Sequence, residues 1–242
     1  GNQLAMTTDS YVVDPLFFPG GDIGKLAITG TVNDLAVGGA LPLYLTCSVI
    51  LEEGMDVHDL RRITRSMKQT ADQAGVKVVT GDTKVVPRGA ADKVFINTAG
   101  VGIVPDGIDL GPNRIKVGDV VIINGFVGDH GAAIVDARGE MSLQNTIETE
   151  GAIPLRAEVR GMCELLGLDP LYLANEGKVV AVVPAEHVDQ VLDAMKGHPA
   201  GEHATVIGKV TESPRSSVIL STTFGGERMV DMLVGEQLPR IC

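Results

Sequence analysis

The chain has 242 residues, of which 44% are hydrophobic and 21% charged, so it is long enough to form two compact domains with sizeable cores. Its formal net charge of −11 argues against a surface for nucleic acid or for an anionic membrane. No apolar run reaches the roughly 18 residues of a membrane helix, and the first residues carry no signal-peptide pattern. We therefore expect a cytoplasmic protein without a membrane span.

The N-terminal part of the sequence predicts a strand, a helix and a second strand. The strand is expected over 4–13, where the alternation of apolar residues breaks at Asp9. A helix of small residues follows over 31–42, with Asn33 and Asp34 in its first turn. The next strand is predicted over 43–54.

The clearest helix is predicted from Val57 to Ala74. Its apolar residues recur at the i, i+3, i+4 spacing of one helical face, with Asp56 as the candidate N-cap and Gly75 as the stop. Two further strands are expected over 76–86 and 93–104.

Turn residues dominate 106–119, and we place the domain boundary there. The second half predicts strands and helices in alternation: strands over 120–128, 178–183, 204–211, 216–222 and 227–232, and helices over 129–138, 155–167 and 184–197. The sequence thus predicts an α+β protein with domains over 1–110 and 111–234 and a mobile tail over 235–242.

Three carboxylates from separate elements are candidate metal ligands. Asp9, Asp34 and Asp82 each stand at the end of an apolar run or beside a turn of small residues. Mg²⁺ takes oxygen ligands and commonly bridges protein carboxylates to nucleotide phosphates, so the three could converge on it. Helix caps and turns remain the alternative for each of them.

Polar residues beside strands are the other candidates. Asp129 and His130 follow a glycine where a strand passes to a helix, a place where backbone N–H groups favour anions. The segment lacks the spacing of a P-loop and of a dinucleotide fingerprint. Lys84 and Glu176 occupy turns beside strands, where acid and base groups are common, and surface solvation is the alternative.

The cysteines form neither a CxxC pair nor an even-numbered framework, so no zinc site or disulfide scaffold is expected. Cys47 and Cys163 lie in apolar strand and helix sequence and are predicted to be small buried hydrophobes. Cys242 is the last residue and is predicted to be exposed. Prenylation requires a cysteine fourth from the end, so this type of lipidation is excluded for Cys242.

Five segments together resemble a known family. They read TTDSYVVDPLFFPGGDIGKLAITGTVNDLAVGGALP over 7–42, TGDTKVV over 80–86, NGFVGDHGAA over 124–133, YLANEGKVVAV over 172–182 and PRIC over 239–242. They resemble the HypE family of hydrogenase-maturation carbamoyl dehydratases. This family belongs to the PurM-like superfamily, with aminoimidazole ribonucleotide synthetase, thiamine monophosphate kinase and selenophosphate synthetase.

The resemblance implies a fold and a reaction. An N-terminal mixed-sheet domain would pair with its copy in a homodimer, through 21–30 and the strands nearby, and an α+β domain would follow. A carbamoyltransferase, HypF, would load a carbamoyl group onto Cys242. The protein would then use ATP to dehydrate the thiocarbamate to a thiocyanate, and the HypC–HypD complex would receive the cyanide.

The resemblance also implies roles for the candidate residues. The Mg²⁺ and triphosphate would be held by Asp9, Asp34 and Asp82, with Asn33 and Lys25 as lesser candidates. Asp129 and His130 would line the same cavity. Proton transfer, or orientation of the thiocarbamate, would fall to Lys84 and Glu176 with Asn175 beside them, and the sequence leaves open which of the two is the base.

Two departures from the family pattern are expected to reflect missing sequence. A glycine-rich N-terminal segment that covers nucleotide is absent, and the chain begins at Gly1. A family loop near the phosphates is also absent, so either this chain lacks the loop or the sequence omits residues between Gln144 and Asn145. We favour the omission, because an enzyme without both covering segments would bind ATP poorly.

The sequence leaves two alternative functions. One is a related ATP-dependent synthetase or kinase that acts on a free small molecule, which would have no reason to end in PRIC. The other is a non-catalytic adaptor whose tail docks a partner, and the intact polar motifs oppose it.

Overall fold

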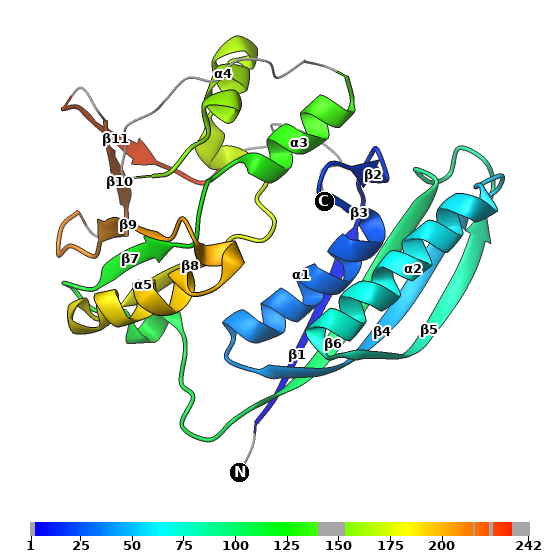
Figure 1. The fold of residues 1–242 in the computed structure, drawn as a ribbon, viewed down its shortest axis with the longest axis horizontal. Coiled ribbons are helices and arrows are strands. Elements are labelled where there is room, and N and C mark those ends of the chain that lie inside the picture. Colours follow the sequence, from blue (N-terminus) through cyan, green and yellow to red (C-terminus); the bar gives the residue numbers. More distant parts are fainter. Residues whose placement is uncertain (1–2, 140–152, 215, 223–224, 234–242) are drawn as a thin grey trace. The chain divides into compact units, whose positions relative to one another are not determined.

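A computed structural model describes residues 3–139, 153–214, 216–222 and 225–233. The chain forms two compact units that divide between Gly111 and Pro112 (Figure 1). The predicted tail, including Cys242, and the junction of Gln144 with Asn145 lie outside the described residues. None of the described helices is long and apolar enough to cross a membrane.

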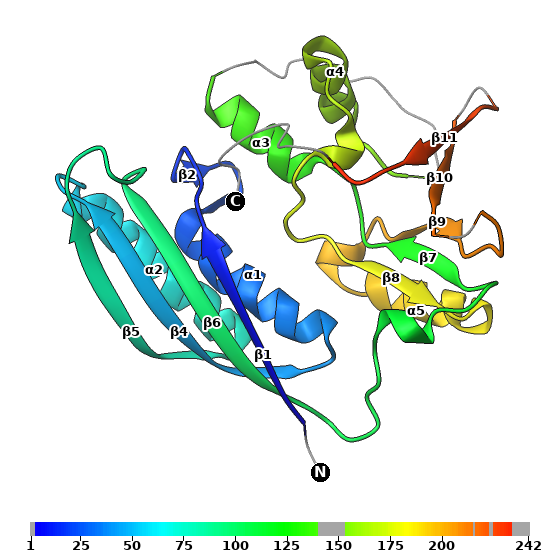
Figure 2. The ribbon, with the colours of Figure 1, turned by 180° about the vertical axis from the view of Figure 1, so that it is seen from behind.

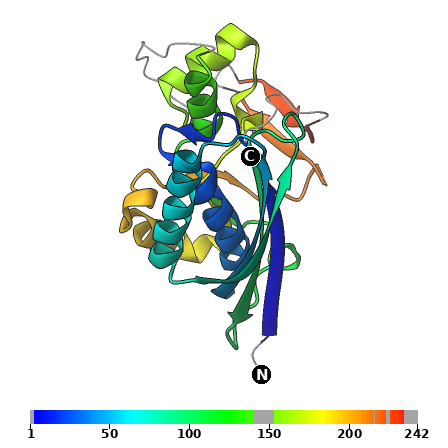
Figure 3. The ribbon, with the colours of Figure 1, turned by 90° about the vertical axis from the view of Figure 1, so that its right-hand side faces the viewer.

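The N-terminal unit is a four-stranded sheet covered by helices on one face. The strand order is β1-β6-β4-β5, in which only the β4–β5 pair is parallel. Helices α1 and α2 lie side by side on one face of the sheet, and no described helix of this unit covers the other face (Figures 2 and 3). The bounds are β1 (Gln3–Tyr11), α1 (Ile23–Val37), β4 (Leu41–Glu52), α2 (Val57–Ala74), β5 (Lys77–Val86) and β6 (Val94–Val104), and a short ribbon of β2 (Phe17–Phe18) and β3 (Gly21–Asp22) precedes α1.

The predicted position of the first helix is wrong, because α1 begins eight residues earlier than expected. The Asp22 carboxylate accepts hydrogen bonds from the Gly24 and Lys25 N–H groups, at 2.8 and 3.1 Å, and caps the helix. The first turns of α1 contain two glycines, and their apolar residues are buried against the sheet and α2. Asn33 and Asp34 therefore lie in the last turns of α1 rather than in its first turn.

The burial of α1 also argues against the expected dimer contact through residues 21–30. The segment 21–30 contains the fully buried Ile23, Ala27 and Ile28, which face the core of their own unit. These side chains are not available to a second copy.

The predicted helix from Val57 to Ala74 is confirmed as α2. Asp56 accepts a hydrogen bond from the His58 N–H at 2.7 Å, and Gly75 ends the helix in the left-handed conformation at φ 70°. The sequence was enough to predict both ends of α2, because the apolar stripe, the N-cap residue and the terminating glycine all indicate the same bounds.

A chain of buried hydroxyl groups joins α1 to the sheet. Thr98 of β6 donates from Oγ1 to the carbonyl of Ala27 in α1 at 2.8 Å. The Thr98 and Thr31 hydroxyls are 2.5 Å apart, and Thr31 is 3.1 Å from the hydroxyl of Tyr11 in β1. Thr31, Thr98 and Tyr11 are all at most 1% exposed, so the polar groups of this interface satisfy one another.

The C-terminal unit combines a small sheet with three helices. The antiparallel sheet has the order β8-β7-β9, and β10 and β11 form a separate ribbon. A core of six buried residues joins α3 to α4 and to the segment after η2: Ala132, Val135, Val159, Met162, Cys163 and Leu173.

The elements predicted for this half are present, several of them shorter at their ends. They are β7 (Val120–Ile123), α3 (Asp129–Ala137), α4 (Ala157–Leu166), β8 (Val180–Val183), α5 (Val188–Lys196), β9 (Thr205–Lys209), β10 (Val218–Ser221) and β11 (Glu227–Val230), with single turns at η1 (Pro112–Arg114), η2 (Pro170–Tyr172), η3 (Ala185–His187) and η4 (Pro199–Gly201).

We expect Thr98→Val to destabilise the N-terminal unit by about 1–3 kcal/mol, because the Ala27 carbonyl and the Thr31 hydroxyl would lose their buried partner. Thr64→Val, at an exposed threonine of α2, is the matched control and should change stability by no more than about 0.5 kcal/mol. Denaturant unfolding of both variants checks this. Equal stability of the two variants would contradict the role given to the hydroxyl chain.

Candidate active site

Asp9 and Asp34 both lie at the β1 edge of the N-terminal unit. The Thr7 hydroxyl donates to the Asp34 carboxylate at 2.9 Å. Thr7 and Asp9 are two residues apart on β1, so both point to the face that α1 covers. Asn33 precedes Asp34 in the same helix, whereas Lys25 lies roughly 13 Å away along the helix axis and donates to the Gly20 carbonyl at 2.9 Å.

Asp82 and Lys84 lie at the other edge of the sheet and on its other face. The register pairs Asp9 with Thr98, Thr98 with Cys47 and Cys47 with Gly81, so these residues share the helix face. Asp82 follows Gly81 and therefore points away from the helices. Strands β6 and β4 separate the two edges, a distance of about 14 Å. A single N-terminal unit thus does not bring the three predicted carboxylates together.

Asp82 and Lys84 form an exposed ion pair, with 3.0 Å between Lys84 Nζ and Asp82 Oδ2. The hydrogen bond from Lys84 lowers the pKa of Asp82, and the Thr83 backbone N–H, at 2.9 Å, lowers it further. The carboxylate therefore stays ionised at neutral pH.

The fit to magnesium is partial. Among the described residues, no group of three or more His, Cys, Asp or Glu side chains is placed to hold a metal ion. Mg²⁺ is commonly held by one or two carboxylates together with substrate phosphates and water. Asp9 and Asp34 supply two carboxylates on the helix face at this edge, which is the number that such a site takes from the protein.

The start of α3 in the C-terminal unit is held by the segment over 173–179. Gly128 precedes the helix with φ 84°, a conformation that favours glycine. Its N–H donates to Asn175 Oδ1 at 2.6 Å, and the Gly131 N–H donates to the Ala174 carbonyl at 3.0 Å. Asp129 and the buried His130 follow directly, so their positions depend on this contact.

Asp129 lies between two cations that the sequence did not indicate as site residues. Arg156 Nε donates to Asp129 Oδ2 at 3.1 Å, and Lys178 Nζ is 4.0 Å from the same oxygen. The other carboxylate oxygen is buried and accepts no hydrogen bond from the described residues. The Arg156 guanidinium also stacks on Phe126, 4.2 Å from the ring centre, which orients it.

Asn124 fixes the other end of the same segment. Its Nδ2 donates to the carbonyls of Gly177 and Ala200, at 3.2 and 2.9 Å, and its Oδ1 accepts from the Val179 N–H at 2.9 Å. Glu176 therefore sits between two fixed points, the Asn175 contact and the Gly177 contact. An asparagine directly after an apolar strand was the available signal for Asn124.

The thiols of the two described cysteines have higher pKa values than an ordinary reactive thiol. Burial and the nearby carboxylates of Asp169 and Glu164 raise the pKa of Cys163 to about 11. Burial also raises the pKa of Cys47, which is half-buried in β4. The prediction of a small buried hydrophobe is confirmed for Cys163.

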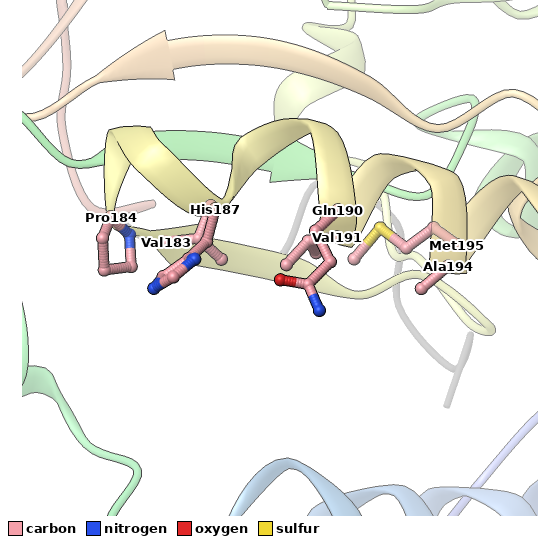
Figure 4. Close-up of a pocket in the computed structure, with 7 residues that line it drawn as sticks. All are labelled: Val183, Pro184, His187, Gln190, Val191, Ala194 and Met195. Atoms are coloured by element: carbon pink, nitrogen blue, oxygen red, sulfur yellow. The ribbon is translucent and has the colours of Figure 1, made fainter.

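A shallow, mostly apolar hollow of about 620 Å³ lies along α5, between its side chains and the end of β8 (Figure 4). Its lining comprises Val183, Pro184, His187, Gln190, Val191, Ala194 and Met195. None of the candidate residues lines it, so it has no part in the site described above.

Comparison with known families defines the class of the protein. The N-terminal domain of AIR synthase related proteins matches residues 1–104, and the C-terminal domain of these proteins matches residues 132–221. The chain is thus a two-domain AIR synthase related protein with the PurM-like α+β fold.

Individual relatives narrow the class. A protein of Rhodobacter capsulatus named carbamoyl dehydratase HypE is 48% identical over an alignment 290 residues long. The alignment covers 100% of this chain and 85% of that protein. A crystal structure of the hydrogenase maturation protein HypE in complex with ATP has a TM-score of 0.91 at 41% identity and covers 99% of this chain and 87% of that one. A HypE–HypF complex has a TM-score of 0.87 at 40% identity, with coverage of 96% and 90%. The chain belongs to the HypE family of carbamoyl dehydratases.

We expect alkylation of the folded protein with iodoacetamide at pH 8 to modify Cys242 first and Cys163 last. A thiol with a pKa of about 11 is ionised only on the order of 0.1% at that pH. Peptide mass spectrometry with time resolves the order, and the rate at Cys163 should rise as the pH approaches 10. Equal rates at Cys163 and Cys242 in the folded protein would contradict the burial described.

Proposed function

We propose that this chain uses ATP to dehydrate an S-carbamoyl group on its own Cys242 to a thiocyanate, which supplies the cyanide ligand for maturation of a nickel–iron hydrogenase. The observation that carries the proposal is the match of the whole chain, Cys242 included, to a carbamoyl dehydratase at 48% identity. The neighbour solved with ATP supports the choice of co-substrate.

The chemistry explains why ATP is needed. The carbamoyl oxygen is a poor leaving group, so it first attacks the γ-phosphorus, and the bond from that phosphorus to the bridging oxygen breaks to release ADP. The nitrogen loses its first proton as the O-phosphorylated imidate forms. A base then removes the second N–H proton, the C–O bond breaks, and phosphate leaves. The products are S–C≡N, ADP, phosphate and a proton.

The residues divide into two tasks. In the N-terminal unit, Asp9 and Asp34 would hold Mg²⁺, which neutralises charge on the triphosphate when it is bound. Asn33 and Lys25 are lesser contributors on the same helix. In the C-terminal unit, Glu176 would accept or orient a proton of the thiocarbamate, because the asparagine contacts on both sides hold its backbone in place. Asp129 and His130 would contact bound substrate at the start of α3.

A homodimer would supply the remaining residues. The uncovered face of the sheet carries the large apolar side chains of Leu4, Met6, Tyr44 and Ile50, and Met6 is 78% exposed. A patch of this kind marks an interaction site. Asp82 and Lys84 lie on this face too. A two-fold axis parallel to the strands would place β5 of one copy beside β1 of the other, and so bring Asp82 and Lys84 toward Asp9 of the partner subunit.

Two partners follow from the chemistry. A carbamoyltransferase must load Cys242, and the neighbour solved as a HypE–HypF complex supports HypF in that role. An acceptor must then take the cyanide, and we assign this to a HypC–HypD scaffold complex.

The direct test is intact-mass measurement of the C-terminal peptide after incubation with the carbamoyltransferase, carbamoyl phosphate and ATP. We expect a carbamoyl adduct on Cys242 that loses the mass of one water with ATP and not with a non-hydrolysable analogue. Glu176→Gln should slow the loss of water by at least about 100-fold, because the proton acceptor is gone. Adducts on Cys47 or Cys163 instead would overturn the proposal.

Glu186→Gln is the matched control, since Glu186 is an exposed glutamate of the same unit. It should leave the rate within about twofold. A Glu176→Gln rate equal to the control would remove Glu176 from the mechanism. Consumption of ATP with a free small molecule by a Cys242→Ala variant would favour the kinase or synthetase alternative.

Met6→Glu should convert the dimer to monomers, because a charge would be buried within an apolar interface. Leu165→Glu is the control, since Leu165 is 77% exposed on α4 and outside the sheet. Sedimentation velocity distinguishes the species. A monomeric parent protein, or a Met6→Glu variant that dimerises like the control, would contradict the dimer.

A further inference from the structure

We propose that Tyr172, Asp169 and Arg228 are positioning residues that anchor the base of the C-terminal arm, which we define as residues 232–242, beside the segment that carries Glu176. This inference rests on the proposed function, because it concerns how Cys242 is delivered to its own dehydration site. It concerns residues outside the candidate catalytic set.

Two independent contacts attach the β10–β11 ribbon to η2. The Tyr172 hydroxyl donates to the Asp231 carbonyl at 2.8 Å. Arg228 Nη2 donates to Asp169 Oδ2 at 2.6 Å, and the other oxygen of Asp169 caps η2 by accepting from the Leu171 N–H at 3.0 Å. One contact holds the end of β11 and the other holds its middle, so the ribbon cannot pivot about either alone.

The anchor point is itself rigid. Leu173 directly follows Tyr172, is 4% exposed and belongs to the core between α3 and α4. Met232, the first residue beyond the anchor, is 88% exposed. Asp231 is therefore the last residue that the C-terminal unit holds among those described.

The chain from Asp231 to Cys242 is long enough for Cys242 to reach Glu176. Glu176 is four residues after Tyr172, at most about 14 Å away, whereas the eleven residues from Asp231 to Cys242 extend to about 36 Å. The arm can therefore reach Glu176 from the anchor with length to spare. A short tether from a nearby fixed point gives the tethered thiol a high effective concentration at the site.

Loss of the anchor would lengthen the tether. If the ribbon came free, the last fixed residue would be near the end of β9 at Lys209, and the tether would grow from eleven to 33 residues. Effective concentration falls roughly as the −3/2 power of length, so delivery would slow up to about fivefold. Chemistry at the site itself would be unaffected.

The test compares dehydration in cis and in trans. The cis substrate is the protein's own Cys242, carbamoylated by the carbamoyltransferase and followed in a single turnover. The trans substrate is a synthetic S-carbamoyl peptide of the last five residues, added to protein carrying Cys242→Ala. The variants are the double substitution Tyr172→Phe with Arg228→Gln and the control Glu227→Gln, which changes one charge on the neighbouring residue of β11.

We expect the double variant to slow the cis reaction three- to fivefold and to leave the trans reaction within about 1.5-fold of the parent, with the control unchanged in both. A purely structural defect in the site would slow both reactions equally. Unchanged cis rates, or equal losses in cis and trans, would overturn the anchor.

Hydrogen exchange of the peptide over 226–233 separates this proposal from the proposed function. Faster exchange in the double variant, and not in Glu227→Gln, is expected whether or not the protein dehydrates a thiocarbamate. If the parent protein shows no dehydration in either format, the proposed function fails. Exchange that is the same in the parent and the double variant would then overturn the anchor as well.

Discussion

The packing of α1 on its sheet depends on one buried polar contact, the row of hydroxyls from Tyr11 through Thr31 and Thr98 to the carbonyl of Ala27. Buried hydroxyls are costly unless each has a partner, so this row favours one position of the helix over its neighbours. That position brings Asp34 of α1 to Thr7 of β1, which is two residues from Asp9 on the same face of the sheet. The carboxylates of the candidate magnesium site are thus placed by a contact in the core.

The C-terminal unit uses asparagine side chains in a similar way. Asn124 and Asn175 substitute for backbone partners at the two ends of the segment over 173–179, so a loop without regular hydrogen bonding is held at defined points. Glu176 gains a fixed backbone on a loop with no helix or strand around it. The same segment begins at η2, where Tyr172 contacts the ribbon that leads to Cys242. The catalytic candidate Glu176 and the ribbon that leads to Cys242 are therefore both held by the segment that begins at η2.

Sequence patterns predicted most of the fold and only part of the site. Helix α2 was predictable to the residue because periodicity, cap and stop agreed. The start of α1 was not predicted, because the Asp22 cap precedes glycine-containing turns whose helix is stabilised by burial against a neighbouring sheet. The joint role of Asp9, Asp34 and Asp82 in one magnesium site stays a prediction. Strand order places Asp82 at the other edge of the sheet, and the register places it on the opposite face, and neither can be read from the sequence. Arg156 and Lys178 were missed because contact with Asp129 joins residues far apart along the chain.

If ATP activates the carbamoyl oxygen on Cys242 for removal, that oxygen must leave with the phosphate. Loading Cys242 with a carbamoyl group whose oxygen is oxygen-18 allows the label to be followed by mass spectrometry of the products. We expect one labelled oxygen in the released phosphate for every thiocyanate formed on Cys242. Label released as water, with phosphate unlabelled, would show that ATP does not activate this oxygen.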